Sequence, residues 1–196
     1  MAKSTLLLLL LSILYITSTA NSSAIASSSS FIKASCRATT YPALCVQSLS
    51  AYATSIQSSP RQLIQTALAV SLDRAQSTKT YMYRLTKFRG VKPRERAAIK
   101  DCLEEIGDTV DRLTKSVNEL KNINGRTRGQ DFQWHMSNVE TWMSAALTDE
   151  TTCTDGFGGK ALNGKLKTSV RAKIADVAHV TSNALALINK FAASKN

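Results

Sequence analysis

Four cysteines are the residues with the clearest potential for chemistry in this chain. They are Cys36, Cys45, Cys102 and Cys153. Cysteines bind zinc, act as nucleophiles or pair as disulfides, and spacing and compartment decide among these roles. No C-x-x-C pair occurs, and neither histidine lies near a cysteine in the sequence. The usual zinc motifs are therefore absent, and we expect neither a metal nor another cofactor.

The two histidines do not suggest an enzyme. His135 and His179 each stand alone in a helical stretch, with no nucleophile at a motif spacing. The sequence contains no G-x-S-x-G, no H-E-x-x-H and no phosphate-binding glycine loop. It also lacks the Glu-x-x-His pairs that hold metals inside helical bundles. The sequence therefore favours a binding protein over a catalyst.

A row of carboxylates is the best candidate for a binding surface. This acidic row consists of Asp101, Glu104, Asp108 and Asp111. Their spacing of three, four and three residues places them on one stripe of a helix. Such a stripe suits the basic, polar cleft of a partner. The alternative is an ordinary solvated face whose charge is balanced by Arg112 and Lys115.

An apolar run near the N-terminus predicts a secretory signal peptide. The run from Leu6 to Ile16 is followed by small residues up to Ala20 and Ala26. A membrane span needs about 20 apolar residues, so this run is too short. We expect a leader over residues 1–26, cleaved after Ala20 or Ala26, and a secreted extracellular mature chain over 27–196. The only glycosylation sequon, at Asn21, is kept only if cleavage precedes it.

The chain is basic, with a net charge of +11. A basic extracellular protein is attracted to anionic surfaces such as acidic polysaccharides or membrane headgroups. We expect no nucleic-acid partner outside the cell, and no second apolar run is long enough to cross a membrane. Basic residues are densest between Arg84 and Arg96. For these residues taken singly, a solvated helix end and connector is the preferred interpretation.

Helical periodicity dominates the rest of the chain. Apolar residues recur at steps of three and four in four long segments. These segments cover about residues 60–88, 93–122, 131–148 and 162–192. No segment alternates like a strand, so we predict an all-α fold: an antiparallel up-and-down four-helix bundle over 60–196. A helical hairpin over 27–59 precedes it, with a flexible serine-rich start at 27–30 and a new helix beginning at Pro42.

The cysteines should be paired, because an extracellular compartment is oxidising. Sequence alone allows three connectivities. Cys36 and Cys45 are close enough to staple the predicted hairpin, and Cys102 would then join Cys153, just past the third long helix. That second bond would clamp neighbouring helices and contribute about 4 kcal/mol by the chain-entropy estimate.

Several short motifs occur together in a characteristic order. They are Cys36 with TYP at 40–42 and Cys45; Asp101-Cys102 with Glu104, Asp108 and Leu113; WMSAALT at 142–148 leading to Thr152-Cys153 and DGF at 155–157; and SNALAL at 182–187. From about Phe31 to Phe191 the chain thereby resembles the plant invertase/pectin methylesterase inhibitor family. The resemblance implies a four-helix bundle with an N-terminal hairpin and disulfides Cys36–Cys45 and Cys102–Cys153. It also implies a non-enzymatic inhibitor of a cell-wall carbohydrate-active enzyme.

Two target enzymes divide this family. One is pectin methylesterase, which removes methyl esters from homogalacturonan, and the other is acid invertase, which hydrolyses sucrose. The Pro-Lys-Phe motif typical of invertase inhibitors is absent from the start of the third helix, where residues 131–134 read DFQW. The run from 145 to 157 also looks more like the methylesterase side. The resemblance therefore favours pectin methylesterase, with acid invertase as the alternative.

The implied mechanism is a 1:1 complex in which the second and third long helices cover the pectin-binding cleft of the esterase. The expected contacts are Glu104, Asp108 and Asp111 on one helix, and Thr141, Ser144 and Thr148 on the other. Thr152 would either contact the partner or hold the turn beside Cys153. A second alternative is a wall-associated protein without an enzyme target, whose basic surface binds pectin directly. In either case we expect the apoplast and cell wall as its location.

Overall fold

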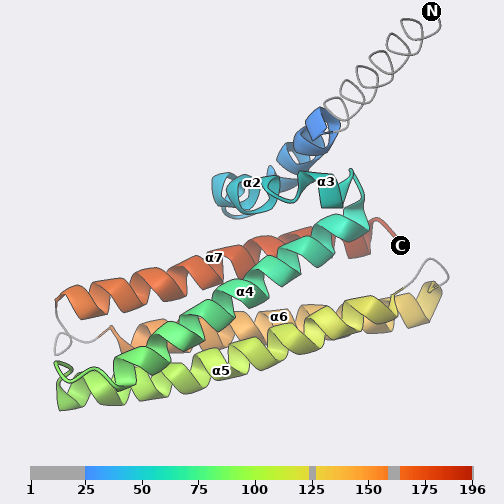
Figure 1. Cartoon of the computed structure of the whole chain (residues 1–196). Helices are drawn as coiled ribbons and strands as arrows, with labels where there is room; N and C mark the ends of the chain where they lie inside the picture. The colour runs from blue at the N-terminus through green and yellow to red at the C-terminus, as the bar shows by residue number, and fades with distance from the viewer. Residues whose placement is uncertain (1–24, 124–126, 159–163, 196) are drawn as a thin grey trace, which may run out of the picture.

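The computed structural model describes residues 25–123, 127–158 and 164–195. The predicted leader up to residue 24 and the sequon at Asn21 lie outside these ranges. Four long helices form the body of the molecule: α4 (Pro60–Thr86), α5 (Pro93–Asn122), α6 (Gly129–Gly156) and α7 (Lys165–Ala193). Each packs against the next in the chain and α7 packs back against α4, with neighbours running antiparallel (Figure 1). The predicted all-α bundle is confirmed, and no strand occurs among the described residues.

Prolines lie at the starts of two of the four long helices. Pro60 and Pro93 both lie in the first turn of their helices, where proline has the required φ and its missing N–H is not needed. Ser59 caps α4, because its Oγ accepts a hydrogen bond from the backbone N–H of Gln62 at 3.3 Å. Glu95 caps α5 by accepting a bond from the N–H of Lys92 at 2.9 Å. Both starts agree with the sequence prediction.

Helix α6 is longer than predicted. The expected end near residue 148 is wrong, because the helix continues to Gly156 and includes Cys153. The hydroxyls of the threonine-rich segment are accommodated in the helix because they bond to the carbonyl four residues earlier, as Thr151 does to Leu147 at 2.9 Å. The buried stripe also continues without interruption. It runs through Met143, Ala146, Glu150 and Cys153.

The N-terminal hairpin packs across α4 and α7 (Figure 1). Its two arms are a helix over residues 25–36 and α2 (Pro42–Ser50), followed by the short α3 (Ala53–Ile56). The flexible start expected at 27–30 is helical instead, and Ser28 is buried. The first arm packs because residues such as Ile32 are fully buried.

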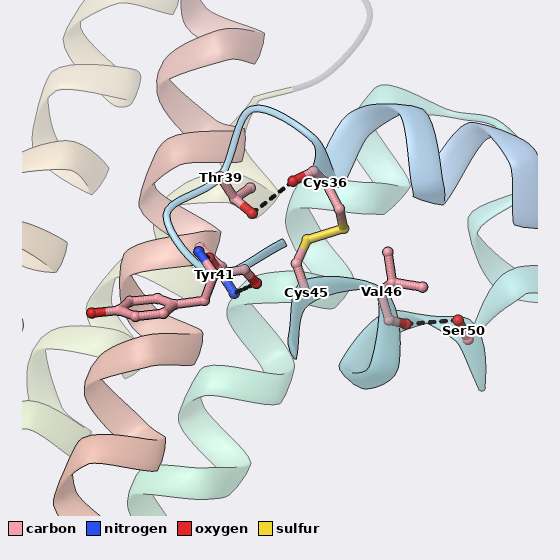
Figure 2. The surroundings of a disulfide bond; sticks show 7 residues. Cys36, Thr39, Tyr41, Cys45, Val46 and Ser50 are labelled. Carbon is pink, nitrogen blue, oxygen red and sulfur yellow. Dashed lines mark hydrogen bonds between the residues drawn. A yellow bond between two sulfur atoms is a disulfide. The ribbon is translucent and has the colours of Figure 1, made fainter. Parts of the chain in front are cut away.

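A disulfide and a buried asparagine fix this hairpin. Cys36 pairs with Cys45 across the turn, with 5.7 Å between their Cα atoms (Figure 2). Asn183 of α7 accepts a bond from the N–H of Tyr41 at 2.9 Å and donates one to its carbonyl at 3.0 Å. The ring of Tyr41 also stacks on His179, with 3.8 Å between centroids. His179 is thus a packing residue that helps to seat the hairpin on α7.

No helix in the described ranges combines the length and the apolarity needed to cross a membrane.

Candidate functional site

Helices α5 and α6 make the most extensive contact of any helix pair among the described residues, and a disulfide joins them near one end. Cys102 of α5 is bonded to Cys153 of α6, with 4.5 Å between their Cα atoms. Both cysteines are buried, because both lie on the stripe that faces the core. The predicted pairing is therefore present, but it connects two helices rather than a helix and a turn.

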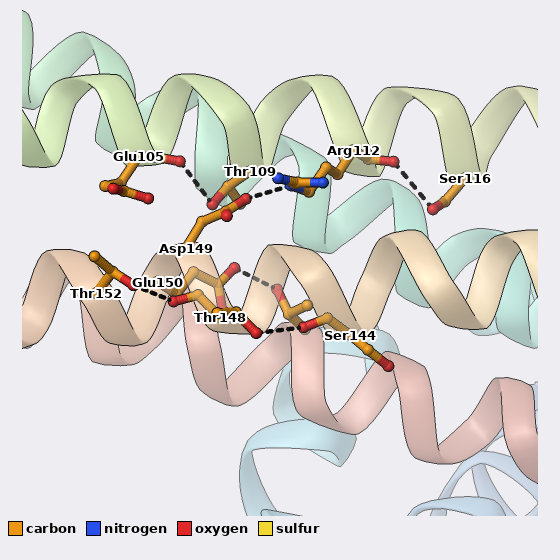
Figure 3. A network of polar contacts seen from close by, with 10 residues as sticks. Glu105, Thr109, Arg112, Ser116, Ser144, Thr148, Asp149, Glu150 and Thr152 are labelled. Carbon is orange, nitrogen blue, oxygen red and sulfur yellow. Dashed lines mark hydrogen bonds and ion pairs between the residues drawn. The ribbon is translucent and has the colours of Figure 1, made fainter.

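An ion pair holds the middle of the same two helices (Figure 3). The Nε of Arg112 lies 2.6 Å from Oδ2 of Asp149. Burial raises the pKa of Asp149, while the hydrogen bond and positive charge of Arg112 oppose that shift. Burial and the nearby Asp149 carboxylate also raise the pKa of Glu105, on the same side of α5. Glu105, Arg112 and Asp149 together form a polar seam between the two helices.

A third polar contact joins the other end of the pair. The carboxylate of Glu119 on α5 accepts a bond from Asn138 Nδ2 at 2.8 Å, and its Oε1 lies 2.9 Å from His135 Nδ1. Hydrogen bonds from Asn138 and His135 lower the pKa of Glu119. His135 contacts Glu119 on the neighbouring helix, and its Nε2 lies 3.5 Å from Oδ1 of Asp131 on α6 itself.

The acidic row lies on the solvent-facing side of α5. All four of its members are exposed, and none forms an ion pair within the described ranges. Arg112, which the solvated-face alternative used to balance the row, is instead committed to Asp149. The carboxylates of Glu104, Asp108 and Asp111 are therefore available to a partner.

A second polar row lies on α6. This hydroxyl row consists of Thr141, Ser144, Thr148 and Thr152, all exposed. Ser144 donates to the carbonyl of Glu140 at 2.8 Å, Thr148 to that of Ser144 at 3.2 Å, and Thr152 to that of Thr148 at 2.9 Å (Figure 3). Thr152 holds no turn, since its position is helical. Each of these three hydroxyl oxygens keeps acceptor capacity toward solvent, because its proton is used within the helix.

The two rows lie on either side of the polar seam. Arg112 directly follows Asp111, and Asp149 directly follows Thr148, so their ion pair separates the acidic row from the hydroxyl row. Carboxylates accept hydrogen bonds, and hydroxyls that already donate do the same. The face of α5 and α6 is therefore rich in acceptors and suits a partner rich in donors.

Both rows were predicted from the sequence, whereas the seam formed by Glu105, Arg112 and Asp149 and the Glu119 contact were not. The disulfide fixes how the antiparallel helices α5 and α6 are aligned, and this alignment predicts which residues face one another. Glu119 follows Cys102 by as many residues as Met136 precedes Cys153, so Glu119 lies opposite the segment that contains His135. No cluster of three or more potential metal ligands occurs within the described residues.

A family model described as "Plant invertase/pectin methylesterase inhibitor" matches residues 30–187. The chain belongs to this family. Since the match spans both disulfides, the hairpin and the two polar rows, all of these features belong to the plant invertase/pectin methylesterase inhibitor domain.

Relatives of known sequence support the assignment to this inhibitor family. The chain is 61% identical over 163 residues to the "21 kDa protein" of Daucus carota, covering 83% of this chain and 84% of the relative. It is 57% identical over 163 residues to "Pectinesterase inhibitor 11" of Arabidopsis thaliana, covering 83% and 80%. A crystal structure of a mutant form of a pectin methylesterase inhibitor from Arabidopsis shares the fold. Its TM-score is 0.62 at 21% identity, over 79% of this chain and 92% of that one.

Proposed function

We propose that this chain inhibits pectin methylesterase by forming a 1:1 complex in which the α5–α6 face covers the pectin-binding cleft of the enzyme. Family membership and relatives that carry the name pectinesterase inhibitor support this target. In this proposal the chain performs no catalysis, and inhibition results from excluding the substrate.

The observation that carries the proposal is the way α5 and α6 are tied together. The Cys102–Cys153 disulfide joins them near one end, and the Arg112–Asp149 ion pair joins them in the middle. The Glu119 contact joins them near the other end. The acidic row and the hydroxyl row are therefore held at a fixed separation. A preorganised surface loses little conformational entropy on binding, so its polar contacts contribute more to affinity.

The two rows have complementary roles in the proposed complex. Glu104, Asp108 and Asp111 attract basic groups and accept charge-assisted hydrogen bonds. Thr141, Ser144, Thr148 and Thr152 accept bonds from neutral or basic donors beside them. Because all seven side chains are exposed, salt should weaken the complex by screening the charged contacts.

Acid invertase is the alternative target, since the family description includes both enzymes. The absence of the Pro-Lys-Phe motif at 131–134 favours the esterase. The deciding experiment titrates the purified mature protein against a plant pectin methylesterase and an acid invertase, measuring both activities. We expect saturable inhibition of the esterase at one inhibitor per enzyme. Inhibition of invertase alone would refute the proposal.

A wall-associated pectin-binding protein with no enzyme target is a weaker interpretation, because it leaves the acidic row without a partner. We propose secretion to the apoplast, where the substrate of the esterase lies. The predicted leader supports this location.

A further inference from the structure

One end of the bundle carries a concentration of basic side chains that the α5–α6 face does not use. It is the end where α4 leads into α5 and where α7 begins (Figure 1). Five exposed cations gather along the connection between the first two helices. They are Arg84, Lys87, Arg89, Lys92 and Arg94, and together with the aromatic residues Tyr83 and Phe88 we call them the basic–aromatic end.

The charged groups that support this connection are separate from those five. Arg96 donates to the carbonyls of Thr86, Phe88 and Val91, which fixes the path of the connection. Glu95, the one carboxylate between residues 79 and 100, caps α5. None of the five exposed cations has a carboxylate partner within the described ranges. They are therefore free to meet an external anion.

Their position is unfavourable for the isolated fold. Lys92 and Arg94 lie at the start of α5, where the helix dipole already places partial positive charge. Helix α7 begins at the same end with no acidic residue in its first turn, and Lys173 Nζ lies 6.0 Å from the ring centre of Tyr81 on α4 (Figure 1). Like charges gathered there repel one another, and a bound polyanion would relieve that repulsion.

Exposed aromatic rings lie among these cations. Tyr83 and Phe88 are 55% and 63% exposed. Lys87 Nζ lies 5.4 Å from the ring centre of Tyr83, and the Phe88 ring covers Gly90 so closely that an added Cβ would lie 3.0 Å from it. A shallow hollow of about 360 Å³, lined in part by Val91, Pro93 and Lys100, adjoins the connection. Flat apolar rings suit the faces of sugar rings, and the cations suit carboxylates.

We propose that the basic–aromatic end binds an acidic polysaccharide, a polyuronate chain of the kind that de-esterified homogalacturonan provides. The choice of polyuronate over other polyanions rests on the proposed function, because removal of methyl esters from pectin leaves carboxylates. The basic–aromatic end precedes the acidic row along the chain and lies at one end of the bundle. Pectate bound there leaves the α5–α6 face open to the enzyme.

The test measures binding of the mature protein to polygalacturonate by calorimetry or affinity electrophoresis, with highly methyl-esterified pectin and phosphatidylserine vesicles as comparison probes. We expect binding to polygalacturonate that weakens with added salt and little binding to either comparison probe. Equal binding to the vesicles, or none to polygalacturonate, would overturn the proposal.

Matched variants locate the surface. Arg89→Ala, Lys92→Ala and Arg94→Ala together should weaken binding about tenfold. The control removes the same number of charges at the opposite end through Arg61→Ala, Arg128→Ala and Lys195→Ala, and should change binding by less than about threefold. Phe88→Ala should weaken binding, whereas Trp134→Ala, on an exposed ring of α6, should not. Equal losses in target and control variants would show a general charge effect and refute the surface.

A parallel experiment measures the direct association of the inhibitor with the esterase in the absence of pectin. The triple variant of the basic–aromatic end should retain that association. Loss of polygalacturonate binding with intact association confirms two separate surfaces. Polygalacturonate binding by a protein that inhibits neither enzyme would refute the proposed function and leave this inference standing.

Discussion

Thr181 of α7 donates a hydrogen bond to Glu150 of α6 at 3.0 Å inside the bundle core, where both side chains are fully buried. The second carboxyl oxygen of Glu150, Oε2, is buried without a hydrogen-bond partner among the described residues. Burial is the main cause that raises the pKa of Glu150, from 4.5 to about 8. The folded protein therefore holds a neutral carboxyl group between α6 and α7 at neutral pH.

This carboxyl makes stability depend on pH in a defined direction. Its pKa is higher in the folded state, so the folded state binds more protons between pH 4.5 and about 8. The contribution is fully present below pH 4.5 and is lost as the pH rises toward 8, on the order of 5 kcal/mol in total. Glu150→Gln removes this titration and should flatten the fall in the free energy of unfolding, measured by urea denaturation across that range.

The control for the glutamate change is Glu104→Gln, the same substitution on an exposed side chain. It should keep the slope of the parent protein. A parent whose stability is constant from pH 4.5 to 8, or a Glu150→Gln variant with the same slope as the parent, would contradict the prediction.

The acidic row should carry much of the inhibition. Replacing Glu104, Asp108 and Asp111 with alanine removes three exposed carboxylates that have no ion-pair partner among the described residues. We expect the inhibition constant for pectin methylesterase to rise at least tenfold, and its dependence on salt to weaken, since fewer charged contacts remain to be screened. The thermal midpoint should change little because these side chains lie outside the core.

Asp73→Asn serves as the comparison, because this carboxylate is exposed, forms no ion pair among the described residues and lies outside the acidic row. This variant should inhibit as the parent does. If the triple alanine variant also inhibits as well as the parent, the acidic row is an ordinary solvated face.

Asn183 should determine how firmly the hairpin is seated. Its side chain makes two hydrogen bonds to the backbone of Tyr41, so Asn183→Ala leaves the Tyr41 N–H without its partner at a part-buried site and leaves the Tyr41 carbonyl with only the bond from the Cys45 N–H. We expect a loss of about 2 kcal/mol in the free energy of unfolding. Hydrogen exchange should show faster exchange across α2, while α5 and α6 remain protected.

Ser182→Ala is the matched control, because Ser182 donates an exposed hydrogen bond at 3.2 Å to the side chain of Thr40 rather than to the backbone of the hairpin. It should cost less than about 0.5 kcal/mol. Unchanged exchange of α2 in Asn183→Ala would mean that the Cys36–Cys45 disulfide and apolar packing seat the hairpin without the asparagine.

The helix starts could be predicted because they depend on local chemistry. Pro42, Pro60 and Pro93 each lie in the first turn of a helix, as their fixed φ requires. The apolar stripes could also be predicted, because residues such as Leu113 and Val139 recur at helical spacing. Both residues are fully buried in the structure. The acidic row follows from the same periodicity, because it lies opposite the stripe of its own helix.

Other features depend on how helices are rotated and aligned, which a single helical pattern does not specify. The Arg112–Asp149 ion pair requires the register of α5 against α6. Glu150 lies within a polar segment of the sequence and was not predicted to be buried, although it stands four residues after Ala146 and three before Cys153 on the buried stripe. Burial of Glu150 and Cys153 continues α6 past residue 148 in place of the turn that threonine and glycine suggest. In these places tertiary packing overrides local preference.

The Cys102–Cys153 disulfide should matter for both stability and inhibition. Its cysteines are 51 residues apart, so the chain-entropy estimate gives about 4 kcal/mol, against about 3 kcal/mol for Cys36–Cys45 at a separation of 9. Replacing each pair with alanine should lower the free energy of unfolding by amounts of that order. Only the loss of Cys102–Cys153 should weaken binding to the esterase at a temperature where both variants are folded, because it alone ties α5 to α6. Equal affinities of the two variants would show that the proposed complex does not need this clamp, since the Glu119 contact and the Arg112–Asp149 ion pair would then suffice to hold the two rows in place.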